Sequence, residues 1–528
     1  MLDLLIRGGT VVDGTGSAPY AADVAVENGR IVEVGTLPGA HARRIISADG
    51  KLVTPGFIDI HRHADLAAWR PGFGQPELRQ GLTTIVNGNC GLSAAPMRRA
   101  KRAEIAAYLQ PICGEMPKQV PTDSLADFFA GQPEAPIHTG MLVGAGVLRA
   151  SAAGYALEHL EDRHYKAIHR AMEQALADGA LGVSLGLGYA PECFYTTQEL
   201  IRALEPLTGQ SIPVTVHMRQ EGGGVLEALE EMLAVARALR IPVHISHLKA
   251  MGRDNWGVKI SRALAMLEKA RQEGLEVGCD VYPYTAGSTQ LIHILPPDFL
   301  TGGIEAVVQR LQDKGAWREL AERIRRGDGF DDIAKLAGWD GIRLTSLHCP
   351  EDHPYQGKSI AEIAALWGQN PLDCCCDLLV REHCEITMVD FMASEEDIVT
   401  ILQSPLSNVI SDSTYPTDGM LHPRVYGTFV HLLEHFVKER GVLTAEQAVH
   451  KMTQKPAQVL RLAGKGVLAP GMDADINVFA LEKLHQPGTY ENPCVLAQGM
   501  DYVLVDGAVA VEKGKYTGVK AGRILKRA

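Results

Sequence analysis

The chain has 528 residues, 46% of them hydrophobic and 22% charged, a composition that is typical of a globular protein and excludes a disordered or fibrous chain. A net charge of −12 argues against nucleic acid or a membrane surface as partner, because both require a basic footprint. No apolar run approaches the roughly 20 residues that a membrane helix needs.

The first residues show neither the basic region nor the small-residue cleavage site of a secretory signal, so we expect no signal peptide. Ten cysteines in such a chain are expected to be buried thiols or metal ligands rather than disulfides. Together these features favour the cytoplasm.

Both ends of the chain contain short strand-like runs separated by turn residues. Asn28-Gly29 near the start and Asp506-Gly507 near the end are hairpin signals, because the two residues accept the backbone conformation of a tight turn. We therefore predict that residues 1–55 and 463–528 together build one small β-sandwich domain.

Between the two ends, strand-like runs alternate with amphipathic stretches such as Arg163 to Asp178, a pattern typical of a parallel α/β fold. The predicted strands are Gly56 to Ile60, Thr83 to Asn87, Met141 to Gly144, Gly182 to Leu185, Val214 to His217, Val243 to Ser246, Glu276 to Val281 and Asn408 to Ser411. Eight strands are what a (β/α)₈ TIM-like barrel needs. We assign residues 56–462 to such a barrel, with an insertion at about 295–385 because the gap between strands seven and eight is too long for one crossover.

The first predicted strand ends in two histidines that alternate with a charged residue. Since side chains alternate across a strand, His61 and His63 point the same way and could share one metal ion. Such a pair also occurs by chance. Its position favours a site, because the chemistry of barrel enzymes lies at the carboxyl ends of the strands.

Further metal-ligand residue types follow other strands: Cys90 after the second, His217 at the end of the fifth, His247 after the sixth and Asp412 after the eighth. Each has a structural interpretation, as a buried thiol, a core histidine or a loop cap. Jointly they make a ring of zinc-type donors. A carboxylate beside a metal-bound water can take a proton from that water and later deliver one to a leaving group, so we expect Asp412 to act as general base and then general acid.

With these residues in place, the chain resembles the N-acyl-D-amino-acid deacylases, or D-aminoacylases, of the amidohydrolase superfamily. The resemblance covers nearly the whole length and rests on Gly56-Phe-Ile-Asp-Ile-His-Arg-His-Ala-Asp65, Gly88-Asn-Cys-Gly91, His217-Met-Arg219, Ser246-His-Leu-Lys249, Asp280-Val-Tyr-Pro-Tyr284, Ser411-Asp412, His422-Pro-Arg424 and Gly427-Thr-Phe429. Most members with two metals carry a bridging lysine on the fourth strand, where this chain has Gly182-Val-Ser-Leu-Gly186. The resemblance implies that Cys90 takes that place.

The resemblance implies zinc-dependent hydrolysis of the amide bond of small-molecule N-acyl-D-amino acids. Because a catalytic zinc keeps three protein ligands and one open position, we predict one tight zinc on Cys90, His217 and His247. His61 and His63 then form a weaker or optional second site.

A substrate carboxylate buried near zinc needs charge-assisted partners. The resemblance assigns this role to Lys249, Tyr282 and Arg424, for which surface ion pairs or core packing are the structural alternatives. It also supplies the D configuration. The loop from Thr285 to Pro297 offers only His293 as a candidate cation, so we expect neutral or apolar substrate side chains.

Two other functions compete with this hypothesis. A cyclic-amide hydrolase of the dihydroorotase or hydantoinase type normally needs the missing lysine. A non-catalytic binding member would be expected to have lost metal ligands, and this chain has kept them. The sequence gives no prediction of oligomeric state.

Overall fold

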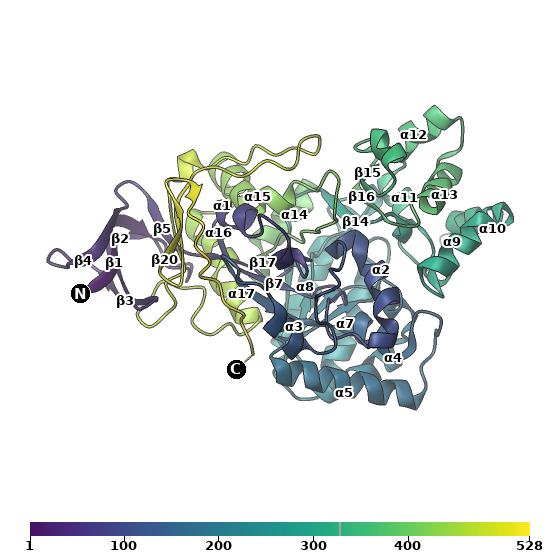
Figure 1. Ribbon diagram of the computed structural model, residues 1–528, viewed down its shortest axis with the longest axis horizontal. Coiled ribbons are helices and arrows are strands. Elements are labelled where there is room, and N and C mark those ends of the chain that lie inside the picture. The colour runs from purple at the N-terminus through teal and green to yellow at the C-terminus, as the bar shows by residue number, and fades with distance from the viewer. Residues whose placement is uncertain (327–328, 528) are drawn as a thin grey trace.

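The computed structural model describes residues 1–326 and 329–527. It places strands from both ends of the chain in one nine-stranded sheet, at the left of Figure 1. Its strands are β1 (Leu2–Val11), β2 (Tyr20–Glu27), β3 (Arg30–Gly35), β4 (Ala42–Ser47), β5 (Leu52–Pro55), β18 (Ile476–Phe479), β19 (Met500–Val505), β20 (Ala508–Glu512) and β21 (Lys515–Tyr516). Their order is β21-β20-β19-β18-β5-β1-β2-β3, with β4 paired to β1. The antiparallel pairing of β5 with β18 joins the two ends of the chain.

The predicted hairpin turns have the expected backbone. Asn28 and Gly29, between β2 and β3, have φ of 52° and 75°, and Asp506 and Gly507, between β19 and β20, have φ of 45° and 77°. Both residues of each pair are left-handed, as a type I′ turn requires. These turns confirm the hairpins predicted at Asn28-Gly29 and Asp506-Gly507.

All eight predicted central strands are present, and all pair in parallel. They are β6 (Phe57–Asp59), β7 (Leu82–Asn87), β8 (His138–Met141) with β9 (Val143–Gly144), β10 (Val183–Gly186), β11 (Val214–His217), β12 (Val243–Ile245), β13 (Val277–Val281) and β17 (Ser407–Val409). One sheet has the order β6-β7-β8 and the other β17-β13-β12-β11-β10-β9, with only Leu142 between β8 and β9. Beyond the first and last strands, the backbone N–H of His63 donates to the carbonyl of Ser413 (2.8 Å). The segments that follow β6 and β17, the first and last of these strands, therefore lie side by side.

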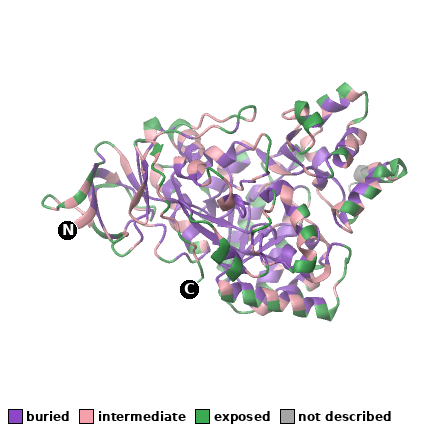
Figure 2. Cartoon of the chain, viewed as in Figure 1, coloured by how far each residue is buried: buried purple, intermediate pink, exposed green. Residues whose placement is uncertain are grey.

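Helices follow most of these strands, and Figure 2 shows their inner faces and the strands as buried. They are α1 (Gln75–Arg79), α2 (Arg102–Cys113), α3 (Leu125–Gly131), α4 (Ala145–Ala153), α5 (Asp162–Asp178), α6 (Thr197–Ala203), α7 (Val225–Leu239), α8 (Lys259–Gln272), α14 (Glu395–Gln403), α15 (Arg424–His431), α16 (Ala445–Met452) and α17 (Gln454–Val459), with a π-helix at Leu432–Glu439. Among the described residues, no helix combines the length and the apolar character needed to cross a membrane.

A separate group of elements lies between β13 and β17, at the upper right of Figure 1. It contains an antiparallel sheet of β14 (Ala286–Gln290), β16 (Ile386–Phe391) and β15 (Ile342–Leu347), and the helices α9 (Ile304–Gln312), α10 (Lys314–Arg326), α11 (Ile333–Ala337), α12 (Ile360–Trp367) and α13 (Pro371–Arg381). The sheet extends beyond the predicted 295–385 at both sides. The sequence of β14, Ala-Gly-Ser-Thr-Gln, has no strand pattern of its own, and it pairs with β16 about a hundred residues later.

Candidate metal centre and substrate cavity

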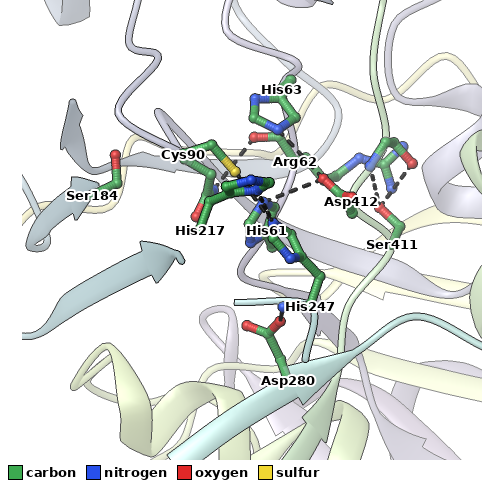
Figure 3. Close-up of polar contacts among 12 residues, drawn as sticks. His61, Arg62, His63, Cys90, Ser184, His217, His247, Asp280, Ser411 and Asp412 are labelled. Atoms are coloured by element: carbon green, nitrogen blue, oxygen red, sulfur yellow. Dashed lines mark hydrogen bonds and ion pairs between the residues drawn. The ribbon is translucent and has the colours of Figure 1, made fainter. Parts of the chain in front are cut away.

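The predicted donor residues meet beyond the carboxyl ends of the parallel strands (Figure 3). The Cys90 sulfur lies 3.2 Å from Nε2 of His61 and 3.6 Å from Nε2 of His247. His217 Nδ1 lies 3.0 Å from His247 Nε2. One carboxylate oxygen of Asp412 is 3.3 Å from His61 Nε2 and 3.4 Å from His63 Nε2.

Three of these residues have an unusual backbone. Cys90, His247 and Asp412 adopt φ of 53°, 38° and 53°, in the left-handed region that L-residues other than glycine seldom enter. Each left-handed residue costs on the order of 1 kcal/mol or more, and such strain persists where the surrounding structure fixes it. The left-handed conformation bends the backbone after the strand, and the three side chains face the common centre.

His61 and His63 face the same centre, as their spacing predicts, and the intervening Arg62 points away. Its guanidinium is fully buried and lies 3.2 Å from Asp59 and 3.0 Å from Glu77. Arg62 therefore fixes the loop that carries both histidines.

The donor atoms form two overlapping groups in which all ligand atoms lie within 4.8 Å of one another. One is His61, Cys90, His247 and Asp412, and the other is His217, Glu221 and His247. In a tetrahedral zinc site with Zn–S of about 2.3 Å and Zn–N of about 2.0–2.1 Å, sulfur and nitrogen ligands lie roughly 3.5 Å apart. The two sulfur–nitrogen distances at Cys90 fit that requirement. The first group places Cys90 with His61 and His247, whereas the predicted tight set paired it with His217 and His247.

The local charges favour the forms that bind metal. Burial alone would raise the pKa of the Cys90 thiol, but His61, His217 and His247 lower it well below its usual value. Burial likewise opposes ionisation of Asp412, and Arg424, His61 and His63 overcome it, so the pKa of Asp412 lies well below its ordinary range. A thiolate and a carboxylate are thus stable in this buried place.

Glu221 is a site residue that the sequence reasoning missed. Its carboxylate accepts hydrogen bonds from His247 Nδ1 (3.0 Å) and from the Lys249 ammonium (2.7 Å). Burial would raise its pKa, but Lys249, His217 and His247 lower it below the ordinary value. Glu221 therefore orients the His247 ring, as carboxylates behind metal-bound imidazoles do. The available signal was its position four residues after His217.

The three predicted carboxylate-binding residues are close together but differ in their contacts. The Lys249 ammonium donates to Glu221 and to the backbone carbonyl of His247 (3.1 Å). Arg424 is fully buried, contacts the second oxygen of Asp412 (3.0 Å), and has its guanidinium carbon 4.9 Å from the Tyr282 ring centre. Lys249 and Tyr282 line the cavity in front of the centre, and Arg424 lies behind them.

That cavity has a volume of ≈390 Å³. His217, His247 and Asp412 form part of its wall, and a second part is apolar: Leu187, Phe194, Leu295, Leu300, Ile333 and Met392. The cavity also contains two cations that the sequence reasoning did not place there. Arg219 pairs with Glu231 (3.0 Å), and Arg323, from α10, pairs with Asp298.

His293, the cation candidate of the loop after the seventh strand, does line the cavity. Its ring packs 4.4 Å from that of Tyr189. Burial lowers its pKa to about 3, so the imidazole is neutral at physiological pH.

Comparisons with known proteins identify relatives of the chain. Residues 409–511 match the model of the amidohydrolase family. The chain is 33% identical to the D-aminoacylase of Alcaligenes xylosoxydans xylosoxydans over 99% of its own length and 98% of that protein's. It is 34% identical to the N-acyl-D-glutamate deacylase of the same organism, over 100% and 97% of the two lengths.

The chain belongs to the N-acyl-D-amino-acid deacylase family of amidohydrolases. Among solved structures, it is similar to the N-acyl-D-glutamate deacylase of Bordetella bronchiseptica in complex with zinc and a phosphonate that mimics the tetrahedral intermediate. The identity is 32%, the TM-score is 0.83, and both chains are covered completely. The relative named as a D-aminoacylase and the one named for D-glutamate are almost equally identical to this chain, so identity alone does not assign its substrate side chain.

Proposed function

We propose that this protein hydrolyses the amide bond of N-acyl-D-amino acids in a zinc-dependent reaction, releasing a carboxylate and a free D-amino acid. The observation that carries the proposal is the buried cluster of thiolate, imidazoles and carboxylate in the wall of a ≈390 Å³ cavity. The full-length relatives supply the reaction and the D configuration.

Zinc would be held by Cys90 with two imidazoles, for which the distances support His247 together with His61 or His217. We retain one tight ion on Cys90, His217 and His247, and a weaker one at His61 and His63, as the proposed occupancy. Zinc bound there supplies Lewis-acid activation of the water nucleophile and of the acyl carbonyl.

Asp412 is the proposed general base and then general acid. One of its carboxylate oxygens lies beside His61 and His63, and the other forms an ion pair with Arg424. The carboxylate is ionised before reaction, as a base must be, and it reaches the cavity where the amide would lie.

The substrate carboxylate is proposed to bind Lys249 and Tyr282 at the cavity wall, with Arg424 behind them adding positive charge. Fixing the carboxylate on one side and the acyl carbonyl at the metal leaves a single direction for the side chain, so the site distinguishes enantiomers. We propose neutral or apolar side chains, supported by the apolar wall and by the neutral His293.

The two alternative functions are less well supported. Strand β10 carries Val183-Ser-Leu-Gly186 and no lysine, unlike the cyclic-amide hydrolases described above. A non-catalytic role does not explain why the Asp412 carboxylate lies at the cavity wall beside His61 and His63.

The remaining parts of the proposal concern architecture and setting. We propose that the eight parallel strands close as a (β/α)₈ barrel over residues 56–462, and that 1–55 and 463–528 form the β-sandwich domain. The proposed partner is the small-molecule substrate, without nucleic acid or membrane. The ten cysteines are unpaired, which supports a cytoplasmic location.

Metal analysis of the purified protein, followed by rates on N-acetyl derivatives of D- and L-amino acids, tests this function. We expect zinc and activity on D substrates. Hydrolysis of dihydroorotate or a hydantoin in preference to them would favour the cyclic-amide alternative, and metal-free protein without activity on any amide would favour the binding role.

A further inference from the structure

A second cavity, of ≈180 Å³, lies at the amino ends of the parallel strands, opposite the metal centre. It is lined by the residues that directly precede four strands, and by residues of α8 and α17, which are labelled in Figure 1. The lining residues that the argument uses are His244, Arg271, Glu276, Asn408 and Lys455. None of them takes part in the proposed hydrolysis.

Two lysine ammonium groups share the carbonyl of Ser407 beside this cavity, and one of them, Lys455, lines it. The buried Lys451 ammonium donates to the carbonyls of Ser404 (2.6 Å) and Ser407 (3.1 Å), and Lys455 donates to those of Pro405 and Ser407 (3.2 Å). Among the described residues, the hydrogen bonds of both ammonium groups go to carbonyl and hydroxyl oxygens and not to carboxylates. Burial and then the neighbouring cation lower the pKa of Lys451 to about 7, and burial and Arg271 lower that of Lys455 to about 8. A buried ammonium group without an anionic partner costs folding free energy.

Two polar atoms enclosed behind the cavity wall have no hydrogen-bond partner among the described residues. They are the side-chain nitrogen of Asn408, a residue only 1% exposed, and Nε2 of His244. His244 lies 3.2 Å from the deeper Asp280 carboxylate, but without hydrogen-bond alignment. The lining carboxylate, Glu276, is already paired with Arg461 (3.0 Å). Among the described residues, the lining cations Lys455 and Arg271 therefore have no carboxylate partner, whereas the lining carboxylate of Glu276 is already paired.

We propose that this cavity binds a small inorganic oxyanion of the phosphate type. Such an ion carries several acceptor oxygens and negative charge, which match the cationic groups of Lys455 and Arg271 in the cavity lining. The volume is about six times the roughly 30 Å³ that a water molecule occupies in the liquid, enough for one tetrahedral oxyanion with some water. The site is separate from the metal centre, because the strands lie between them.

Calorimetric titration of the zinc-loaded, full-length protein with inorganic phosphate tests this proposal, with chloride at equal ionic strength as reference. We expect one saturable site and a melting temperature that rises with phosphate but not with chloride. Lys455→Met should abolish the binding. Arg271→Gln, a change at an exposed residue that leaves folding intact, should weaken it about tenfold, as loss of a charge-assisted contact does. Lys269→Met, two residues earlier on α8, removes a cation that does not line the cavity and that pairs with Glu273 at the surface; it is the control and should bind as the wild type does.

Two results would overturn the proposal. One is the absence of phosphate binding beyond the chloride reference. The other is binding that competes with the N-acyl amino acid and is unchanged in Arg271→Gln, which would place the phosphate at the metal centre. If Lys455→Met fails to fold, the phosphate affinity of Arg271→Gln compared with that of Lys269→Met still tests the proposal. The titration measures binding directly, so its outcome does not depend on the proposed amide hydrolysis.

Discussion

Cys90 holds its sulfur within 3.6 Å of two imidazoles from a left-handed backbone position. We predict that Cys90→Ala strips the tight zinc, because the variant lacks the only sulfur ligand of the proposed site. Metal content measured after gel filtration checks this. Cys375→Ala, which removes a buried thiol of α13 far from the centre, is the control and should keep its zinc. Full zinc occupancy in Cys90→Ala would remove Cys90 from the site.

Asp412 is the residue on which proton transfer is proposed to depend. Asp412→Asn keeps the shape but cannot accept the proton, so we expect kcat to fall on the order of a hundredfold or more while zinc is largely retained. Steady-state kinetics with parallel metal analysis measures both. Near wild-type activity would show that Asp412 only caps the loop that follows β17 and takes no part in proton transfer.

Arg424 has two predicted effects because it contacts both Asp412 and Tyr282. Arg424→Ala should raise KM for N-acyl amino acids without changing zinc content, since a contact present in ground and transition state is lost. It should also raise the pKa of Asp412, because burial then acts against less positive charge. The acidic limb of the kcat/KM profile would accordingly move to higher pH. Equal KM and an unmoved limb would show that Arg424 is only a packing residue.

At the scale of elements, the two ends of the chain are joined to the parallel strands by a buried ionic network. Lys465 contacts Asp473 (3.0 Å) and Asp475, and His138 of β8 contacts Asp475 (3.1 Å). Burial would raise the pKa of Asp475, but His138 and Lys465 hold it well below its usual value. The stabilisation is therefore present above the ordinary pKa of an aspartate and is lost as pH falls towards the lowered one.

We predict that Lys465→Met destabilises the protein by about 3–5 kcal/mol, because it leaves buried carboxylates without a cation. Comparison of denaturation midpoints with those of the exposed control Lys483→Met measures the effect. Since a chain of several units need not unfold in one step, the midpoint shift is the quantity to compare. Equal midpoints would show that the Lys465 ammonium does not stabilise the folded protein.

The elements also show what the sequence could predict. The central strands carry their own apolar runs and turn signals, so they were found, as were the hairpins at Asn28-Gly29 and Asp506-Gly507. Strand β14 was not found, because a Gly-Ser-Thr segment becomes a strand only through a partner far along the chain. The role of Glu221 and the cavity position of Arg323 likewise depend on which elements fold together, and local spacing does not contain that information.

At the scale of the whole molecule, the cavity combines walls from the parallel strands and from the elements between β13 and β17. Its apolar wall predicts faster hydrolysis of N-acetyl-D-leucine or N-acetyl-D-methionine than of N-acetyl-D-glutamate. The ratio of kcat/KM values measures this. A much higher value for the glutamate derivative would show instead that Arg219 or Arg323 leaves its carboxylate partner and receives the substrate side chain.

The most direct measurement of the central claim is the rate of hydrolysis of N-acetyl-D-methionine by protein that has been stripped of metal and then titrated with zinc. The account predicts no activity in the stripped protein, recovery as zinc is added, and little activity on the L enantiomer or on the D-amino amide that lacks the carboxylate. Equal rates before and after metal removal, or equal rates on the acid and its amide, would contradict it.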